Sequence, residues 1–173
     1  MDKMLQAIVD AFGTCEIEEN GIWRPLDMGT YKDDFKKRNN RFVAEPKCVE
    51  FLQEKNITHT RYGFDALFDI QPKDFLKLPP HIARTPDYVM FLDKAVFMEA
   101  KGCHDILRLK DDDMKAYDWW VEIMPMTMFI YSTMEKTHKL ISYPSLKELA
   151  MKGKTGRYPD NNKLYYEVPW ESI

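Results

Sequence analysis

The chain has 173 residues and a formal net charge of −3, with 45% hydrophobic and 13% aromatic residues. One domain of this size can bury a substantial core, and the acidic balance excludes a surface that is basic all round, while leaving room for local basic patches. The three cysteines, Cys15, Cys48 and Cys103, are scattered and form no CxxC pair, so free thiols in a reducing compartment are expected.

The first 39 residues are expected to form an N-terminal extension made of a helix and a short hairpin. Apolar residues recur at helical spacing up to Phe12, and Glu19-Asn20-Gly21 is a turn signal between two short strands. This start of the chain carries Asp2 and Asp10 and no long apolar run. It therefore indicates neither a signal peptide nor a membrane span.

Residues 40–173 are expected to fold as an α/β domain with a mixed central sheet flanked by helices. The pattern predicts helices over residues 44–55, 111–122 and 145–152, and strands over residues 57–64, 88–92, 95–102, 127–132 and 164–168. Ser145 is expected to cap the last helix, with Glu148 completing a capping box. Residues 65–84 hold three prolines and predict an irregular segment.

Charged residues stand at the ends of the two most apolar strands. Asp87 comes directly before the first strand, and Glu99 and Lys101 lie near the end of the second. A hairpin would bring Asp87 close to both, and residues 99 and 101 would point to the same face of one strand. The alternative is a solvated strand edge, which such apolar strands disfavour. A buried carboxylate pair without a cation would be costly, so the pattern predicts a divalent-metal site.

Mg²⁺ prefers oxygen ligands, few of them from protein and several from water. Asp87 and Glu99 are suitable ligands, the carbonyl of Ala100 is a third candidate, and Glu45 at a helix start is a fourth. A metal-bound site of this kind suits phosphodiester hydrolysis, in which Lys101 would orient the attacking water or offset charge on the phosphate. The four histidines show no metal-ligand spacing.

Several motifs occur in a fixed order between residues 40 and 132. They are the helix from Glu45 to the turn Lys55-Asn56-Ile57, then Thr85-Pro86-Asp87-Tyr88, then Met98-Glu99-Ala100-Lys101-Gly102, then Asp112-Asp113-Met114-Lys115, and finally the apolar strand from Pro125 to Ser132. This order resembles the PD-(D/E)xK nuclease superfamily and, more narrowly, the phage endonuclease I family of Holliday-junction resolvases.

The resemblance implies a restriction-endonuclease-like core and a DNA endonuclease that depends on Mg²⁺ or Mn²⁺. It places the active-site residues at Glu45, Asp87, Glu99 and Lys101. It also implies a homodimer with intertwined subunits, paired nicks in branched DNA, and a bacteriophage protein acting in the cytoplasm of its bacterial host.

Basic clusters are candidates for contacts with DNA phosphates, each with a solvated surface as its alternative. The first comprises Lys36, Lys37, Arg38 and Arg41, the second Arg108, Lys110 and Lys115, and the third Lys147, Lys152, Lys154 and Arg157. At least one of Trp119 and Trp120, together with Tyr117, is expected in the core rather than stacked on bases.

Two other functions stay open. A sequence- or damage-directed DNA nickase would use the same fold, and a catalytically inactive nucleic-acid-binding protein would keep the fold without the activity. The intact set of three acids and one lysine, Glu45, Asp87, Glu99 and Lys101, argues against the inactive protein.

Overall fold

A computed structural model describes residues 17–19, 22–24, 43–63 and 77–173. The strands are β1 Ile17–Glu19, β2 Ile22–Arg24, β3 Thr58–Arg61, β4 Tyr88–Phe91, β5 Ala95–Cys103, β6 Ile106–Lys110, β7 Met126–Ser132, β8 Thr137–Ser142, β9 Lys154–Arg157 and β10 Leu164–Pro169. The helices are α3 Ala44–Glu54, α6 Asp111–Ile123 and α7 Tyr143–Lys152, with a 3₁₀ turn η1 at Trp170–Ser172.

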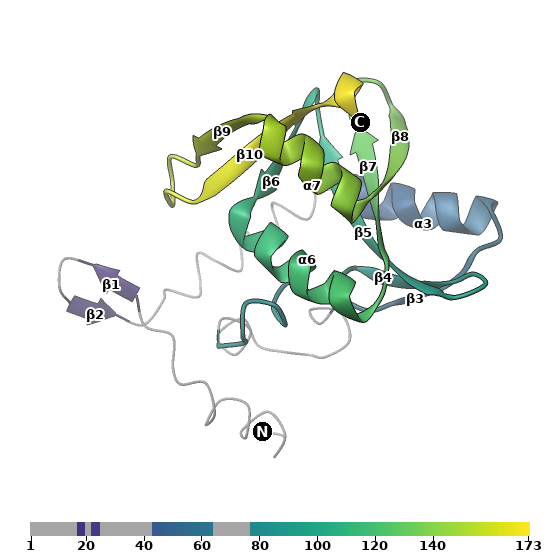
Figure 1. Ribbon diagram of the computed structural model, residues 1–173, viewed down its shortest axis with the longest axis horizontal. Helices are drawn as coiled ribbons and strands as arrows, with labels where there is room; N and C mark the ends of the chain where they lie inside the picture. The colour runs from purple at the N-terminus through teal and green to yellow at the C-terminus, as the bar shows by residue number, and fades with distance from the viewer. Residues whose placement is uncertain (1–16, 20–21, 25–42, 64–76) are drawn as a thin grey trace, which may run out of the picture.

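The central sheet has five strands in the order β3-β4-β5-β7-β8 (Figure 1). Only its β5–β7 pair is parallel, and the other neighbours run antiparallel. The expected mixed sheet flanked by helices is therefore confirmed. The hairpin of β4 and β5, which the sequence predicted, lies at the middle of this sheet.

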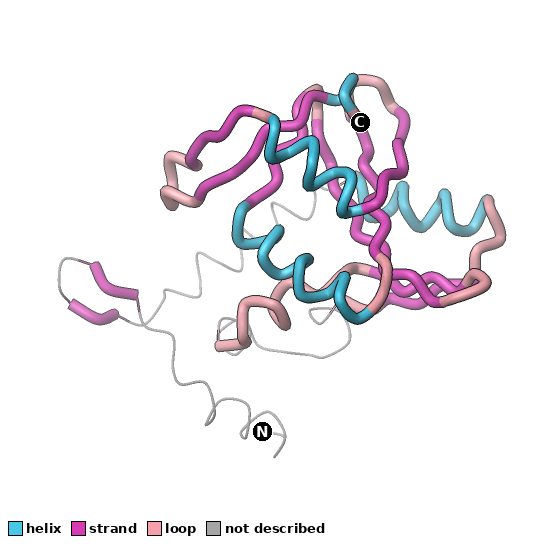
Figure 2. Tube along the Cα trace, viewed as in Figure 1, coloured by secondary structure: helices cyan, strands magenta, loops and turns pink. Residues whose placement is uncertain are grey.

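Helices cover both faces of the central sheet, with α3 on one side and α6 and α7 on the other (Figures 1 and 2). On the α3 side, Cys48 and Leu52 pack in one buried cluster with Met98 of β5. On the opposite side, Phe97 of β5 packs with Leu146 of α7. Neighbouring residues of β5 thus pack in different cores, one on each face of the sheet. This explains why nearly all residues of the strand are apolar.

A second sheet has three antiparallel strands in the order β6-β10-β9. Leu107, Leu109 and Val168 point from this sheet into the core that it shares with α6 and α7. The sequence pattern did not predict β6, β8 or β9, because they are short or half-exposed strands without a clear apolar pattern. Strand β6 pairs with the distant β10, whereas β8 and β9 form hairpins with β7 and β10.

The predicted cap of helix α7 was wrong. The helix begins at Tyr143, and Ser142 is its N-cap, with Ser142 Oγ accepting the backbone N–H of Ser145 at 3.2 Å. Pro144 stands in the first turn of the helix, where its missing N–H costs nothing and its fixed φ suits the helix. The helix therefore begins one residue before the proline, and the cap is Ser142 instead of Ser145.

Strands β1 and β2 pair antiparallel, with Ile17 opposite Arg24, as the turn signal predicted. The predicted helix ending near Phe12, the basic cluster of residues 36–41 and Cys15 lie outside the described residues. The division between an extension over residues 1–39 and a domain over residues 40–173 stays a prediction. None of the described helices has the length and hydrophobicity needed to cross a bilayer.

Candidate functional site

The β4–β5 hairpin brings the two predicted metal ligands side by side. Tyr88 pairs with Met98 across the strands, so the preceding Asp87 falls beside Glu99. The backbone N–H of Asp87 donates to Glu99 Oε2 at 3.2 Å, and the N–H of Ala100 donates to Asp87 Oδ2 at 2.9 Å. The ladder of the hairpin therefore fixes how close the two carboxylates lie.

Lys101 joins this pair from the same strand, as the spacing of residues 99 and 101 predicted. Its Nζ lies 2.7 Å from Glu99 Oε1 and 3.6 Å from Asp113 Oδ2. The hydroxyl of Tyr117, which comes from α6, donates to the same Glu99 Oε1 at 2.7 Å. The Glu99 carboxylate, in a residue only 5% exposed, is thus held by one charged donor, Lys101, and by two neutral donors, the Tyr117 hydroxyl and the N–H of Asp87.

Glu45 reaches the site through Arg61, which ends strand β3. One guanidinium nitrogen of Arg61 donates to Glu45 Oε2 at 2.6 Å and to the Tyr88 hydroxyl at 2.9 Å, and the other lies 3.6 Å from Asp87 Oδ1. In the described part of the chain, no three His, Cys, Asp or Glu side chains are arranged to hold a metal together. The role of Glu45 as a metal ligand stays a prediction.

A pocket of about 160 Å³ opens at these side chains. It is lined by Ala83, Arg84, Thr85, Asp87, Glu99, Lys101, Asp113 and Tyr117. Arg84 donates to Asp113 Oδ1 at 3.1 Å and lies 3.4 Å from Asp112 Oδ2, so it ties the segment before β4 to the start of α6. The pocket is therefore polar, and both positively and negatively charged side chains line it.

The electrostatic balance is unfavourable for Asp87. Burial raises the pKa of the Asp87 carboxyl well above its usual value, and the carboxylates of Glu99 and Glu45 add to this effect. Lys101 and the N–H of Ala100 oppose it only in part. The ionised form of Asp87 is therefore only partly balanced by Lys101 and by Arg61, 3.6 Å from Asp87 Oδ1, which is the condition that a metal cation would relieve.

The surroundings also shift the pKa values of three other groups in the pocket, Lys101, Asp113 and Tyr117. Burial disfavours the Lys101 ammonium, but Glu99 outweighs it and raises the pKa of Lys101 well above its usual value. Burial likewise opposes the charge of Asp113, whereas Lys101, Lys110 and Arg84 lower the pKa of its carboxyl. Burial and Glu99 raise the pKa of Tyr117, so its hydroxyl keeps the proton that it donates.

This donor set fits a small divalent cation of the Mg²⁺ type. Such an ion takes one or two carboxylates and keeps several waters, so a complete protein cage is not needed. Asp87 and Glu99 supply two neighbouring carboxylates, and the backbone of Ala100 passes between Glu99 and Lys101. A pocket of about 160 Å³ has room for a cation and several waters, each of which occupies roughly 30 Å³ in the liquid.

The structure describes two of the three predicted basic clusters. The cluster Lys36, Lys37, Arg38 and Arg41 lies outside the described residues. Arg108 and Lys110 lie on β6, and Lys115 of α6 pairs with Asp111 at 2.7 Å. Lys147 of the third cluster pairs with Asp118 at 2.7 Å, and Arg108 pairs with Glu167 at 3.2 Å. Arg108, Lys115 and Lys147 thus already have acidic partners.

The sequence did not predict three side chains of the site: Arg61, Arg84 and the hydroxyl of Tyr117. Tyr117 carried a usable signal, because it stands four residues after Asp113 and thus on the same helix face. The two arginines carried none, since only the pairing of β3 with β4 and the fold of the segment before Thr85 bring them to the pocket.

The sequence matches no protein-family model and no curated protein. Among solved structures, the chain is similar to a nuclease from a fusselovirus, with a TM-score of 0.43 and 9% sequence identity. That similarity covers 80% of this chain and 84% of the other.

Proposed function

We propose that the protein is an endodeoxyribonuclease that hydrolyses phosphodiester bonds with the help of Mg²⁺ or Mn²⁺, and that it prefers branched DNA. The observation that carries this proposal is the meeting of Asp87, Glu99 and Lys101 in one polar pocket. The buried Glu99 and the half-buried Asp87 lie side by side, and Lys101 lies between Glu99 and a further acid, Asp113. Withdrawing so many acids from water is costly unless further positive charge joins them, so the arrangement has little structural use.

Asp87 and Glu99 would hold the cation, with the carbonyl of Ala100 and, after a change of its Arg61 partner, Glu45 as further ligands. When bound, the ion would neutralise charge on the phosphate and make a water molecule more acidic. The chain positions its own acids for this, because the hydrogen bonds from Asp87 N–H and Ala100 N–H fix both carboxylates.

Lys101 would act on the attacking water or on the charge that develops on the phosphate. Its ammonium is held by Glu99 and Asp113, so it is charged and oriented before a substrate enters. Tyr117 is a positioning residue, because it donates to Glu99 rather than to a substrate. Arg84 adds a second cation at the pocket wall, where a DNA phosphate would pair with it.

The preference for branched DNA rests on the sequence resemblance to the phage endonuclease I family, as does the homodimer. Two copies of the pocket in such a dimer would cut two strands of one junction. Neither feature is required for the chemistry of a single pocket, so a nickase with a fixed sequence or lesion preference would use the same residues.

A cleavage assay separates these functions. The purified protein is offered a four-way junction, a nicked duplex and a linear duplex with Mg²⁺ or Mn²⁺. Paired cuts confined to the junction support the proposal, and cuts in linear duplex at one sequence favour the nickase. Binding without cutting in either metal favours the inactive DNA-binding protein.

Variants test the residues. Asp87→Asn and Lys101→Ala are each expected to abolish cutting while leaving junction binding largely intact. Asp93→Asn and Lys94→Ala, in the exposed turn of the same hairpin, are matched controls that should cut normally. Normal cutting by Asp87→Asn or Lys101→Ala would show that the site is misassigned.

A further inference from the structure

The outward face of the three-stranded sheet combines aromatic rings with cations. Across the strands, Tyr165 pairs with Lys110, and Glu167 pairs with both Arg108 and Lys154. Paired residues share a face, and the alternate residues of these strands are the ones buried in the core. We call the outward set the aromatic–basic face, made of Arg108, Lys110, Lys154, Tyr158, Tyr165 and Glu167.

The two tyrosine rings are held in place rather than free. The ring of Tyr165 lies across Gly156 of β9, where any side-chain carbon would overlap it. The ring of Tyr158 packs on that of Tyr165 with centroids 4.6 Å apart. Both residues are only partly buried, so the rings are fixed at the surface and lose little freedom when a planar ligand stacks on them.

Cations surround these rings. The Arg108 guanidinium lies 5.1 Å from the centroid of Tyr165, and the Lys110 ammonium lies 6.0 Å from that of Tyr158. The one acid of the face, Glu167, pairs with Arg108 at 3.2 Å, and the Arg108 side chain is still 52% exposed. With three cations and one acid, the aromatic–basic face is positive on a chain whose net charge is −3.

The face leads to the pocket. Strand β6 ends at Lys110, and helix α6 begins at the next residue with the acidic turn that carries Asp113 into the pocket (Figure 1). Lys163, just before β10, pairs with Asp112 of the same turn at 3.2 Å. A strand of DNA lying on the face would therefore reach the pocket without leaving the protein surface.

We infer that the aromatic–basic face binds single-stranded DNA, so that the substrate of the pocket carries an unpaired strand beside the cut. Unpaired bases expose flat faces that stack on tyrosine, whereas the bases of a duplex are already stacked on each other. The cations follow the phosphates of the same strand. The choice of DNA rests on the proposed function, and the stacking surface rests on the rings and charges alone.

The test measures binding by the full chain in EDTA, where no cutting occurs. The probe is fluorescein-labelled oligothymidylate of about 12 nucleotides, within the site sizes of single-strand-binding folds. Tyr158→Leu and Tyr165→Leu should each weaken binding about fivefold or more, whereas Tyr158→Phe and Tyr165→Phe keep the ring and the affinity. All four variants should bind a duplex of equal length with the same affinity as the unaltered protein.

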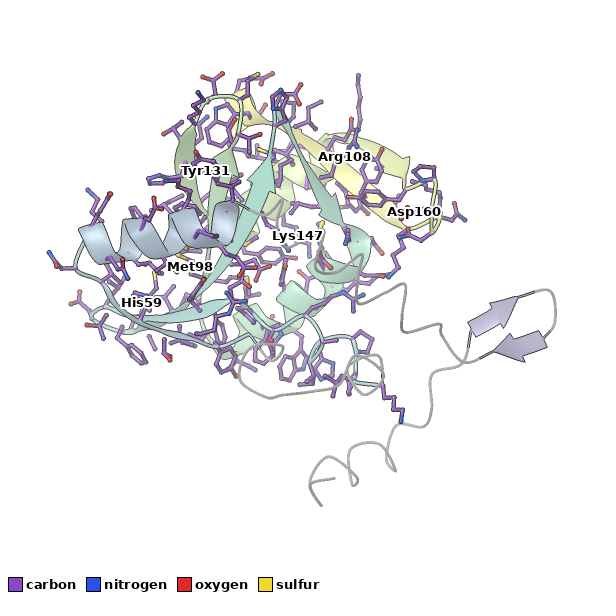
Figure 3. All side chains as sticks on the ribbon, turned by 180° about the vertical axis from the view of Figure 1, so that it is seen from behind. His59, Met98, Arg108, Tyr131, Lys147 and Asp160 are labelled. Atoms are coloured by element: carbon purple, nitrogen blue, oxygen red, sulfur yellow. The ribbon has the colours of Figure 1, made fainter. Side chains whose placement is uncertain are left out.

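The charges have a matched control. Lys154→Ala should lower the slope of log affinity against log salt by about 0.7, the value for one phosphate contact on a single strand. Lys94→Ala, in the β4–β5 turn, should leave the slope unchanged. That turn and the β9–β10 hairpin lie at different ends of the molecule (Figure 1), and Figure 3 likewise shows Arg108 and Asp160 far from His59 of β3.

Photocrosslinking of an iodouracil-substituted oligonucleotide gives an independent readout. Crosslinks at Tyr158 or Tyr165 support the inference, and crosslinks elsewhere with unchanged affinity of both leucine variants overturn it. An equal loss of duplex and single-strand binding in the leucine variants also overturns it. If the protein cuts no DNA but the leucine variants lose oligothymidylate, the nuclease proposal fails and the binding face stands.

Discussion

Among single residues, Asp87 carries the clearest conflict between folding and function. It is a half-buried acid beside two other carboxylates, Glu99 and Glu45, and desolvation and these carboxylates raise its pKa. Without a metal ion, Arg61 and Lys101 offset the charge of Asp87 only in part. The Asp87 carboxylate is therefore where a metal ion would have its largest effect on stability as well as on chemistry.

Asp87→Asn should raise the melting temperature of the metal-free protein by a few degrees, the effect of about 1 kcal/mol in a domain of this size. The amide oxygen can still accept the N–H of Ala100, and the repulsion from Glu99 is gone. Saturating Mg²⁺ should raise the melting temperature of the unaltered protein and not that of the variant. A variant that melts lower without metal and responds equally to Mg²⁺ would contradict this account of Asp87.

Tyr117→Phe removes the hydroxyl that donates to Glu99 Oε1. The loss of a buried hydrogen bond to a carboxylate should cost about 1 to 3 kcal/mol of unfolding free energy, and DNA cutting should fall about 10- to 100-fold. Chemical unfolding and a cleavage time course measure the two effects.

Tyr143→Phe is the control for Tyr117→Phe. Tyr143 packs against Tyr117 at 5.5 Å, and its hydroxyl donates to Met114 and Asp118, away from the pocket. It should lose similar stability and keep its cutting rate. Equal losses of rate in both variants would mean that Tyr117 acts only through packing.

Among the elements, the sequence predicted those whose character is local. Strands β4, β5 and β7 are apolar and bounded by turns, and the starts of α3 and α6 follow from their acidic first turns. Strand β6 depends on a partner that lies far away in the chain, β10, whereas β8 and β9 form hairpins with β7 and β10 but are too short and exposed to show an apolar pattern. The same limit applies to the site: Asp87, Glu99 and Lys101 share one hairpin, whereas Arg61 and Arg84 need the finished fold.

Helix α7 offers a direct test of its corrected start. Ser142→Ala removes the side chain that accepts the N–H of Ser145, and should cost about 1 kcal/mol of unfolding free energy. Ser145→Ala should change it by less than about 0.5 kcal/mol, because it keeps the N–H that Ser142 Oγ accepts and loses only an exposed hydrogen bond between the two hydroxyls at 2.7 Å. Urea unfolding of both variants measures the two losses of unfolding free energy. A larger loss for Ser145→Ala would support Ser145 as the N-cap, with Glu148 in a capping box.

The junction between α7 and β9 depends on Gly153. A side-chain carbon at this position would collide with the backbone carbonyl of Glu167 in β10, which cannot move without disturbing the ladder. Gly153→Ala should therefore cost more than about 2 kcal/mol. Gly102→Ala is the control, since its new carbon would meet Ala44 at 3.5 Å, an ordinary contact, and thermal unfolding should detect almost no change.

In the whole molecule, the central sheet contributes residues to two hydrophobic cores, one on each of its faces. The cluster with Cys48 and Leu52 and the cluster with Tyr117 and Leu146 share the strands β4, β5 and β7 between them. The pocket lies at the start of β4 and beside the second half of β5, so its geometry depends on strands that belong to both cores. Loss of packing on the α3 side should therefore also destabilise the core on the side of α6 and α7.

Leu52→Ala tests this coupling. Leu52 is fully buried on the α3 side, and its truncation should cost about 2 to 5 kcal/mol. Trp120 and Trp170 lie in the other core, so their fluorescence, measured with Trp23 and Trp119 replaced by Phe, reports on that side, while far-ultraviolet circular dichroism reports on the whole fold. The two signals should shift together to the same lower midpoint. A fluorescence midpoint that stays in place would mean that the two cores unfold separately.

The most direct measurement is an anomalous difference map from crystals soaked in Mn²⁺. A peak between the carboxylates of Asp87 and Glu99, absent from Asp87→Asn crystals, is the expected result. A map in which Mn²⁺ sits elsewhere, or in which the two acids stay bridged by protein groups alone at saturating metal, would contradict the proposal that they hold the catalytic ion.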